Sequence, residues 1–440
     1  MTQRFRSLYI LGFLFCFACG GESDSNNVMD ASPDVVAPAD LRDFQPDGGW
    51  SEEDASEMPA DLSTSTEDAL SGDVELDSTT APEDPWIEVY AAIEAKRAEA
   101  DLPGLAVAVT RPGEVLWTGA FGFANLETQL KATTDTPFML ASVSKTMTAA
   151  ALMHAWEAGA FGFDDDINSH LPFKVDNPLV EDETISLRHL VTHTSGIQDN
   201  WGEMPYLEGD STQSFGDYLK DYLTPEGARY NATKNFYELM PGTERNYGNI
   251  ATALAGFVLE SATQTRFDAY CEEHIFEVLS MENTGWHLAD FDPATVAMPY
   301  RYNEGAYEAI GHYGYGDYPS GQLRCSVSDL ARFLAAVSNQ GKIGDAQFLQ
   351  PETVAEMFSS QISYLDPGQK VFWYEANVSG REVIAHSGGD KGVATEMVYS
   401  AQTGVGVIVL SNTSWDSLSG FYSSIVDILF DQGEALQGLR

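Results

Sequence analysis

Leu-Ala-Ser-Val-Ser-Lys-Thr occupies residues 140–146, and the rest of the chain is best understood from it. Ser142 and Lys145 are three residues apart, so on a helix they share a face and their side chains can meet. Residues 147–156 are rich in Ala, Leu and Met and favour a helix that is apolar nearly all round. A helix N-terminus carries partial positive charge, and a half-buried lysine has a lowered pKa and can accept a proton. The spacing therefore predicts a serine nucleophile activated by a lysine.

Ser144 is the competing nucleophile, because it directly precedes Lys145. Adjacent helical residues point about 100° apart, so Ser144 and Lys145 face different directions. This favours Ser142. A lone Ser-x-x-Lys occurs by chance in many chains, so the rest of the sequence must decide whether the pair carries chemistry.

The composition predicts a large folded part with a strongly acidic surface. Of 440 residues, 43% are hydrophobic and 11% aromatic, enough for a substantial core. The formal net charge is −44, and residues 20–85 alone hold 19 acidic residues and one arginine. A polyanion would be repelled and no basic stripe is visible, which argues against nucleic acid as a partner.

Residues 1–19 have the pattern of an export signal. Two arginines precede an apolar run at 8–17 that is too short to span a bilayer as a mature helix. The end of the segment resembles a bacterial lipoprotein processing site, in which Cys19 would become the lipidated first residue; Cys16 stands where such sites usually carry Leu. An ordinary secretory signal and an uncleaved membrane anchor are the alternatives. We expect an exported protein, lipid-anchored to the bacterial cell envelope in the periplasm or at the outer membrane.

Residues 20–85 consist mainly of Asp, Glu, Ser, Pro, Ala and Thr. Such a segment cannot bury enough apolar surface to offset its ordering entropy, and like charges extend it. The composition predicts a disordered acidic tether. An acidic binding tail is the alternative.

Residues 86–433 are expected to form one α+β domain with a sandwich-like arrangement. A helix at 87–100 begins it and one at 417–430 closes it, and the strand patterns lie toward both ends: 105–110, 115–121, 371–377, 381–385, 394–400 and 405–411. The middle, about 145–290, reads as helices and loops. We therefore expect an antiparallel sheet formed from both chain ends and covered by helices, plus an inserted all-helical lobe. A cleft between the lobes is the default site.

Three further stretches complete a specific pattern: residues 185–196, residues 241–249 with Tyr247-Gly-Asn249, and His-Ser-Gly-Gly at 386–389. Together with Ser142-x-x-Lys145, they resemble the motif set of the serine β-lactamase-like hydrolases. That family includes penicillin-recognising D-alanyl-D-alanine peptidases, class C β-lactamases and related esterases. The resemblance covers about 105–415 and implies a β-lactamase/transpeptidase-like fold.

The resemblance implies a role for each of the first motif residues. Ser142 would be the acylated nucleophile, and Lys145 a proton acceptor and fixed charge. Tyr247 would be the general acid/base, its pKa lowered by Lys145. Asn249 would hold Lys145 and the substrate by hydrogen bonds.

The late motif would shape the substrate site. His386, Ser387 and Gly388 would form the strand beside the substrate, and the backbone N–H groups of Ser142 and Gly389 would form the oxyanion hole. No cofactor or metal is implied.

Several of these residues have simpler interpretations. Tyr247 could be a core aromatic residue, and His386 could cap a strand. His189 and His193 are four apart, as in a zinc pair, but His189 has no adjacent Glu and no third ligand is evident. In the family, that run is a structural loop beside the site.

Two other features bear on the hydrolase class and on the body cysteines. Ser195 and Ser387 precede glycine, but the chain has no G-x-S-x-G elbow, which argues against an α/β-hydrolase. Cys271 and Cys325 could form a disulfide or be two separate buried thiols.

His386 also bears on the substrate. True β-lactamases usually carry Lys-Thr-Gly where this chain has His386-Ser387-Gly388. Histidine is mostly neutral near pH 7, so it attracts a substrate carboxylate less than lysine does. We expect a serine hydrolase that acts through an acyl-enzyme on ester or amide substrates, D-amino-acid peptides included. The loops at 201–216 and 300–318 would line the cleft. The alternative is a penicillin-binding or sensor module without turnover.

Overall fold

The computed structural model describes residues 84–181, 183–414 and 421–437. At its centre is a seven-stranded antiparallel sheet with the order β13-β14-β15-β16-β1-β2-β3. The early strand β1 (Gly104–Arg111) pairs with β2 (Glu114–Asn125) on one side and with the late strand β16 (Gly406–Ser411) on the other. The predicted sheet formed from both chain ends is confirmed.

The remaining strands of this sheet are β3 (Leu130–Lys131), β13 (Tyr374–Val378), β14 (Arg381–Asp390) and β15 (Val393–Tyr399). β14 is longer than predicted: it continues past 385 and contains the whole motif at 386–389. Small residues have low strand propensity, so the sequence pattern ended the strand too early. Pairing with β15 continues through Gly388–Thr395 and Gly389–Ala394 and extends it.

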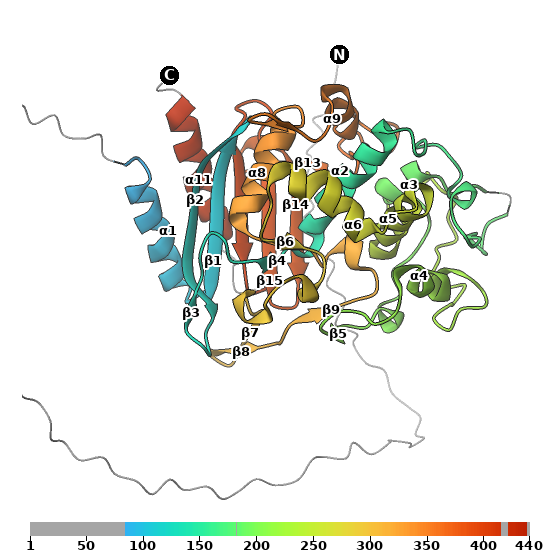
Figure 1. Cartoon of the computed structure of the whole chain (residues 1–440), viewed down its shortest axis with the longest axis horizontal. Helices are drawn as coiled ribbons and strands as arrows, with labels where there is room; N and C mark the ends of the chain where they lie inside the picture. Colours follow the sequence, from blue (N-terminus) through green and yellow to red (C-terminus); the bar gives the residue numbers. More distant parts are fainter. Residues whose placement is uncertain (1–83, 182, 415–420, 438–440) are drawn as a thin grey trace, which may run out of the picture. The chain divides into compact units, whose positions relative to one another are not determined.

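Both faces of the sheet are covered by helices (Figure 1). Side chains alternate along a strand. The odd-numbered residues of β1 from 105 to 109 pack against α1 (Ile87–Glu99) and α11 (Tyr422–Gln437), and the alanines between them pack against α8 (Val327–Ser338). This is why β1 is buried along nearly its whole length. The predicted first helix is confirmed to within a residue, whereas the closing helix lies later than predicted, and 415–420 fall outside the described residues.

A helical lobe packs beyond α2 (Ser144–Glu157). Its elements are α3 (Leu187–Val191), α4 (Phe215–Leu223), α5 (Asn249–Thr263), α6 (Phe267–Cys271), a π-helical turn at Glu272–Phe276 and α7 (Glu277–Leu279); α9 (Pro351–Met357) packs on α2 from later in the chain. The sequence predicted an all-helical lobe, whereas the observed lobe also contains short strands. Its short strands β5 (Leu207–Glu208) and β6 (Thr284–Gly285) pair with β9 (Tyr313–Gly314) and β10 (Arg324–Cys325), which lie later in the chain.

The other short elements are β4 (Phe138–Met139), β7 (Tyr300–Asn303), β8 (Ala306–Ala309), β11 (Lys342–Ile343) and β12 (Ala346–Gln347). Two 3-10 turns matter for the site: η1 (Ala141–Val143) and η7 (Tyr318–Ser320). β4 pairs with β10 and runs almost directly into η1, so the sheet fixes where this turn begins.

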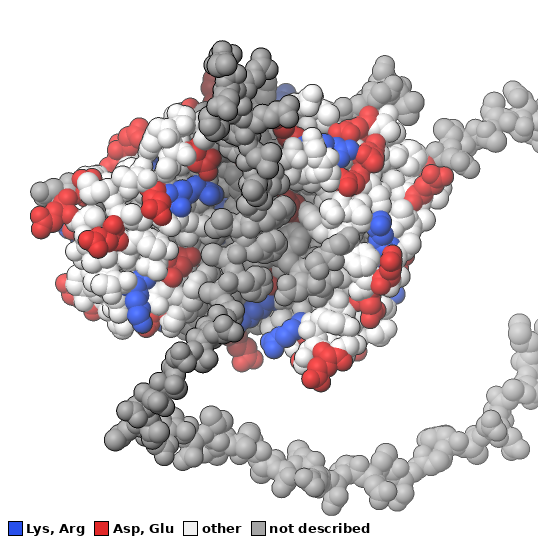
Figure 2. Space-filling view, turned by 180° about the vertical axis from the view of Figure 1, so that it is seen from behind, with Lys and Arg blue, Asp and Glu red and all other residues white. Residues whose placement is uncertain are grey.

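The predicted export signal, Cys19 and all but the end of the predicted tether lie outside the described residues. Within the described part, no helix combines the length and apolar character needed to cross a membrane. Cys271 and Cys325 are separate buried thiols and not a disulfide. On the face that Figure 2 shows, acidic side chains are spread over the described surface and Lys and Arg side chains are scattered among them.

Candidate active site

Ser142 lies in a tight turn between the sheet and a buried helix. It belongs to η1, and α2 begins only at Ser144, so Ser142 precedes the helix instead of lying within it. Ala141 has a φ of 47°, in the left-handed region that is unfavourable for alanine. Thr395 Oγ1, on β15, donates to the carbonyl of Leu140 at 2.6 Å. The strained turn is therefore held by the sheet beside it.

Lys145 brings its ammonium group to Ser142. Its side chain is fully buried, and Nζ donates to Ser142 Oγ at 3.2 Å, to Asn249 Oδ1 at 2.7 Å and to the carbonyl oxygen of Ser320 at 2.6 Å. Burial lowers the pKa of Lys145 to about 7, although Asp199, with other carboxylates, opposes the shift. Near neutral pH the amine can both lose and accept a proton.

Ser144 is placed differently from Ser142. It is fully buried, and its Oγ accepts the backbone N–H of Leu323 at 3.2 Å. This hydroxyl therefore satisfies a buried backbone donor. The geometry favours Ser142 as the nucleophile.

Tyr247 lies above the serine–lysine pair. Lys145 Nζ is 4.8 Å from the centroid of its ring, the ring of His193 packs against it with centroids 4.5 Å apart, and the tyrosine as a whole is 43% exposed. Burial of the hydroxyl raises the pKa of Tyr247, and a hydrogen bond with Ser142 opposes that shift. The expectation that Lys145 lowers the pKa of Tyr247 is wrong, because burial of the hydroxyl dominates and raises it. Tyr247 therefore keeps its proton at neutral pH, where part of Lys145 is deprotonated.

Asn249 is the first residue of α5 and connects Lys145 to a carboxylate that the sequence did not single out. Its Nδ2 donates to Asp199 Oδ2 at 3.0 Å. Asp199 also accepts the backbone N–H groups of Asn249 and Ile250, so it caps the N-terminus of α5. The only sequence signal for this residue was its place just after the loop at 185–196.

Close contacts with the nucleophile turn and with β15 require a glycine at position 388. A Cβ on Gly388 would lie 2.4 Å from the carbonyl oxygen of Leu140, 2.3 Å from Thr395 Oγ1 and 3.1 Å from the backbone nitrogen of Ser142. β14 therefore lies directly against the turn that carries Ser142. Gly389, the next residue, lines the same pocket as Ser142.

His386 and Ser387 form part of the strand rather than of the pocket wall. His386 Nδ1 lies 2.8 Å from the carbonyl oxygen of Ser387, and burial lowers the pKa of this buried histidine to about 3. Ser387 Oγ lies 3.0 Å from the hydroxyl of Tyr374. Histidine at this position is therefore uncharged at neutral pH.

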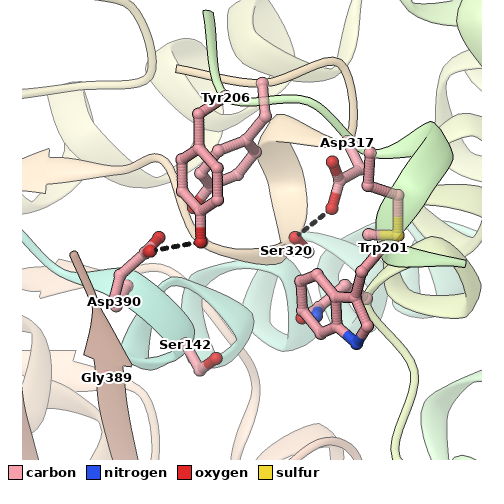
Figure 3. A pocket seen from close by; sticks show the side chains of 12 residues that line it. Ser142, Trp201, Tyr206, Asp317, Ser320, Gly389 and Asp390 are labelled. Carbon is pink, nitrogen blue, oxygen red and sulfur yellow. Dashed lines mark hydrogen bonds between the residues drawn. The ribbon is translucent and has the colours of Figure 1, made fainter. Parts of the chain in front are cut away.

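A pocket opens beside Ser142 (Figure 3). It is lined by Ala141, Ser142, Trp201, Met204, Tyr206, Asn249, Tyr315, Asp317, Ser320, Gly321, Gly389 and Asp390. Both predicted loops, 201–216 and 300–318, contribute to it as expected. The carboxylates of Asp317 and Asp390 were not anticipated, because no motif in the sequence marks them.

The two histidines of the 185–196 run have separate structural roles. His189 Nδ1 accepts the backbone N–H of Ser186 and caps α3. His193 Nδ1 accepts the backbone N–H of Gly248, and burial lowers the pKa of its imidazole. Within the described residues, no three His, Cys, Asp or Glu side chains are grouped as metal ligands.

The sequence comparisons agree with this geometry. The family model described as "Beta-lactamase" matches residues 89–417. The protein named "Protein flp" from Staphylococcus aureus strain MW2 is 22% identical over 335 residues, a match that covers 74% of this chain and 62% of that protein. The chain thus spans less than two thirds of that relative's length.

Two solved structures show the same fold at low identity. A class C β-lactamase from Rhodobacter sphaeroides aligns with a TM-score of 0.58 and 20% identity, covering 80% of this chain and 100% of that chain. EstCE1, described as a hydrolase with promiscuous acyltransferase activity, aligns with a TM-score of 0.59 and 20% identity, covering 79% and 98%.

Proposed function

Because the chain belongs to the β-lactamase family, whose members are generally serine hydrolases, we propose that it hydrolyses esters or amides through an acyl-enzyme on Ser142. The observation that carries the proposal is the 3.2 Å contact between Lys145 Nζ and Ser142 Oγ, made by a lysine whose pKa is about 7. A substantial fraction of Lys145 is then neutral at physiological pH and can accept the serine proton.

Acylation would begin with attack of Ser142 Oγ on the substrate carbonyl while its proton moves to Lys145 Nζ. The carbonyl oxygen becomes an oxyanion, which the backbone N–H groups of Ser142 and Gly389 would stabilise. Tyr247, protonated because its pKa is raised, would donate its proton to the leaving oxygen or nitrogen as that bond breaks, and Lys145 would return a proton to Tyr247.

Deacylation would follow the same path in reverse, with water in place of the leaving group. Water attacks the ester carbonyl on Ser142, its proton passes to the Tyr247–Lys145 pair, and the acid leaves as Ser142 Oγ regains a proton. Asn249 keeps Lys145 within reach of Ser142 through the 2.7 Å hydrogen bond. Burial of Lys145 limits its direct contact with water.

The neutral His386 supports esters and D-amino-acid amides over β-lactams. A lysine at this place would offer a full positive charge to a substrate carboxylate, whereas His386, with a pKa near 3, offers none. The purified full chain should therefore turn over p-nitrophenyl esters or D-amino-acid amides without a free carboxylate faster than a chromogenic cephalosporin. A cephalosporin turned over fastest would contradict this ranking.

Fluorophosphonate labelling followed by peptide mass spectrometry tests the nucleophile. We expect one adduct, on Ser142, with Ser142→Ala losing both the adduct and turnover and Ser144→Ala, the matched control, keeping both. An adduct on Ser144, or turnover that survives Ser142→Ala, would overturn the assignment.

The same experiment distinguishes the proposed enzyme from the alternative, a penicillin-binding or sensor module without turnover. Such a module would form a stable adduct on Ser142 but release no product from any ester, peptide or β-lactam. The close set of Ser142, Lys145, Tyr247 and Asn249 supports acylation of Ser142, and measured turnover separates an enzyme from a module that stops at the adduct.

We also propose export and lipid anchoring through Cys19, on the pattern of residues 1–19 alone. The full chain expressed in a bacterium should partition into the detergent phase of a Triton X-114 extraction, and Cys19→Ala should move it to the aqueous phase. Cys16→Ala is the matched control and should stay in the detergent phase. A full chain found in the aqueous phase would contradict the anchor.

A further inference from the structure

Two carboxylates from distant parts of the chain line the pocket beside Ser142 (Figure 3). Asp317 is only 3% exposed and accepts a hydrogen bond from Ser320 Oγ at 2.8 Å. Asp390, half-buried at the end of β14, accepts the hydroxyl of Tyr206 and the backbone N–H of Lys391, both at 2.7 Å. A carboxylate has about four acceptor positions, so these bonds leave capacity for a ligand.

Neither carboxylate has an ion-pair partner within 4.0 Å among the described residues. The nearby cations are engaged elsewhere. Lys145 donates its three bonds at the floor of the site, Lys391 Nζ lies 3.6 Å from the centroid of the Tyr206 ring, and Arg245 is hydrogen-bonded to Gln369. The pocket therefore presents an excess of negative charge, because Lys145 and Lys391 only partly offset Asp317 and Asp390.

Burial of these two carboxylates has an electrostatic cost, and their pKa values show it. Burial raises the pKa of Asp317 to about 6 and raises that of Asp390. A desolvated carboxylate is stabilised when a cation comes to its side. A bound cation would thus relieve a cost that the free pocket carries, whereas a bound carboxylate would increase it.

The pocket walls also suit a cation. Trp201 is 64% exposed at the mouth, and Tyr206 and Tyr315 meet edge to face with ring centroids 6.1 Å apart. Aromatic faces attract ammonium groups, most strongly where water is partly excluded. In Figure 3 the Asp390–Tyr206 pair and Trp201 stand on different sides of the space above Ser142.

We propose that the substrate carries an ammonium group a few atoms from its scissile carbonyl, bound by Asp390 together with Asp317 and the aromatic wall of the pocket. This inference rests on the proposed serine hydrolase function and names its substrate class: amino-acid esters or amides with a free amino group, or esters of an amino alcohol. Asp390 is the specificity-determining residue. Asp317 is tied to Ser320 and supplies supporting charge.

Matched esters test the inference with the wild-type full chain. The acyl side is probed by phenyl D-alaninate and phenyl L-alaninate against phenyl isobutyrate and the N-acetylated alanine esters, which have no charge. The leaving side is probed by acetylthiocholine against 3,3-dimethylbutyl thioacetate. We expect kcat/KM for at least one ammonium substrate to exceed that of its neutral partner by about 10- to 100-fold after correction for spontaneous hydrolysis. Added salt should reduce the preference.

Asp390→Asn then assigns the preference to a residue. The ratio of kcat/KM values for the ammonium and neutral substrates should fall about tenfold or more, a ratio in which intrinsic ester reactivity cancels. Asp345→Asn removes the same charge from the exposed β11–β12 turn and should leave the ratio unchanged. Thermal unfolding of each variant shows that it is folded, and the wild-type comparison stands without either variant.

The outcomes separate this inference from the proposed function. Turnover of neutral esters without an ammonium preference in either pair, or a ratio that Asp390→Asn leaves unchanged, would overturn the inference and leave the hydrolase intact. Absence of any turnover together with absence of an adduct on Ser142 would overturn the proposed function itself.

Discussion

The floor and the mouth of the pocket are built differently. At the floor, Lys145 is fully buried and its three hydrogen bonds connect the nucleophile turn, α5 and η7. At the mouth, Trp201 and Tyr206 stand on loops, partly exposed, and one hydrogen bond joins Tyr206 to Asp390. The difference indicates that the core fixes the chemistry and that the loops select the substrate. Substitutions at the floor should therefore affect every substrate, and those at the mouth only some.

The largest effect is expected from Lys145→Arg. Arginine keeps the positive charge but cannot give up its proton near neutral pH, so it cannot act as the base. The rate of fluorophosphonate labelling of Ser142 should fall by about 10²- to 10⁴-fold, and turnover of every substrate class should fall with it. Thermal unfolding checks that the larger side chain is accommodated, and Lys391→Arg at the mouth is the matched control. A folded variant that labels at the wild-type rate would show that Lys145 is not the base.

Gly388→Ala should have the next largest effect. The added Cβ would meet the carbonyl oxygen of Leu140 at 2.4 Å, so β14 or the nucleophile turn must move. We expect a loss of about 1–3 kcal/mol in the free energy of unfolding, with slower turnover of all substrates. Gly368→Ala, whose Cβ would have neighbours no closer than 3.4 Å, is the control. Equal effects of the two substitutions would contradict the close contact.

Asp199→Asn should separate positioning from catalysis. Asp199 caps α5 and raises the pKa of Lys145, so its neutral isostere should cost about 1 kcal/mol of stability and lower that pKa further. The midpoint of the pH profile of Ser142 labelling should move to lower pH. Lower stability with an unchanged midpoint would show that Asp199 caps α5 but does not affect the pKa of Lys145.

Trp201→Ala should have the smallest effect. The side chain is largely exposed, so thermal unfolding should barely change, while KM for ammonium esters should rise about two- to fivefold with kcat little affected. A large loss of kcat would show that the mouth takes part in the chemistry, which would contradict the division between floor and mouth.

Much of the fold followed from local pattern. The continuous apolar runs of β1 and β16, and the turns that follow strands, predicted the hairpins and the sheet built from both chain ends. The pattern missed the strand at 386–390, because Ser and Gly have low strand propensity. Pairing with β15 nevertheless holds these residues in a strand. The pattern also missed β5 and β6, which exist through pairing with strands far along the chain.

The same division applies to the candidate site: sequence motifs predicted some of its features, and others depend on the tertiary structure. The motifs led to Ser142, Lys145, Tyr247 and Asn249, which the structure brings together, and their catalytic roles stay predictions. The raised pKa of Tyr247 was missed, because burial is a tertiary property that no spacing reveals. Asp390 was missed because its partner Tyr206 comes from a loop far away in the sequence.

In the proposed mechanism, a buried Lys145 with a pKa of about 7 activates Ser142. The most direct test is the rate of fluorophosphonate labelling of Ser142, followed by mass spectrometry from pH 5 to 10. Because the neutral amine is the base, the rate should rise with pH through a single midpoint near 7 and then level off. A rate that is independent of pH across this range, or one that rises only above about pH 9, where an unperturbed lysine begins to lose its proton, would contradict the account.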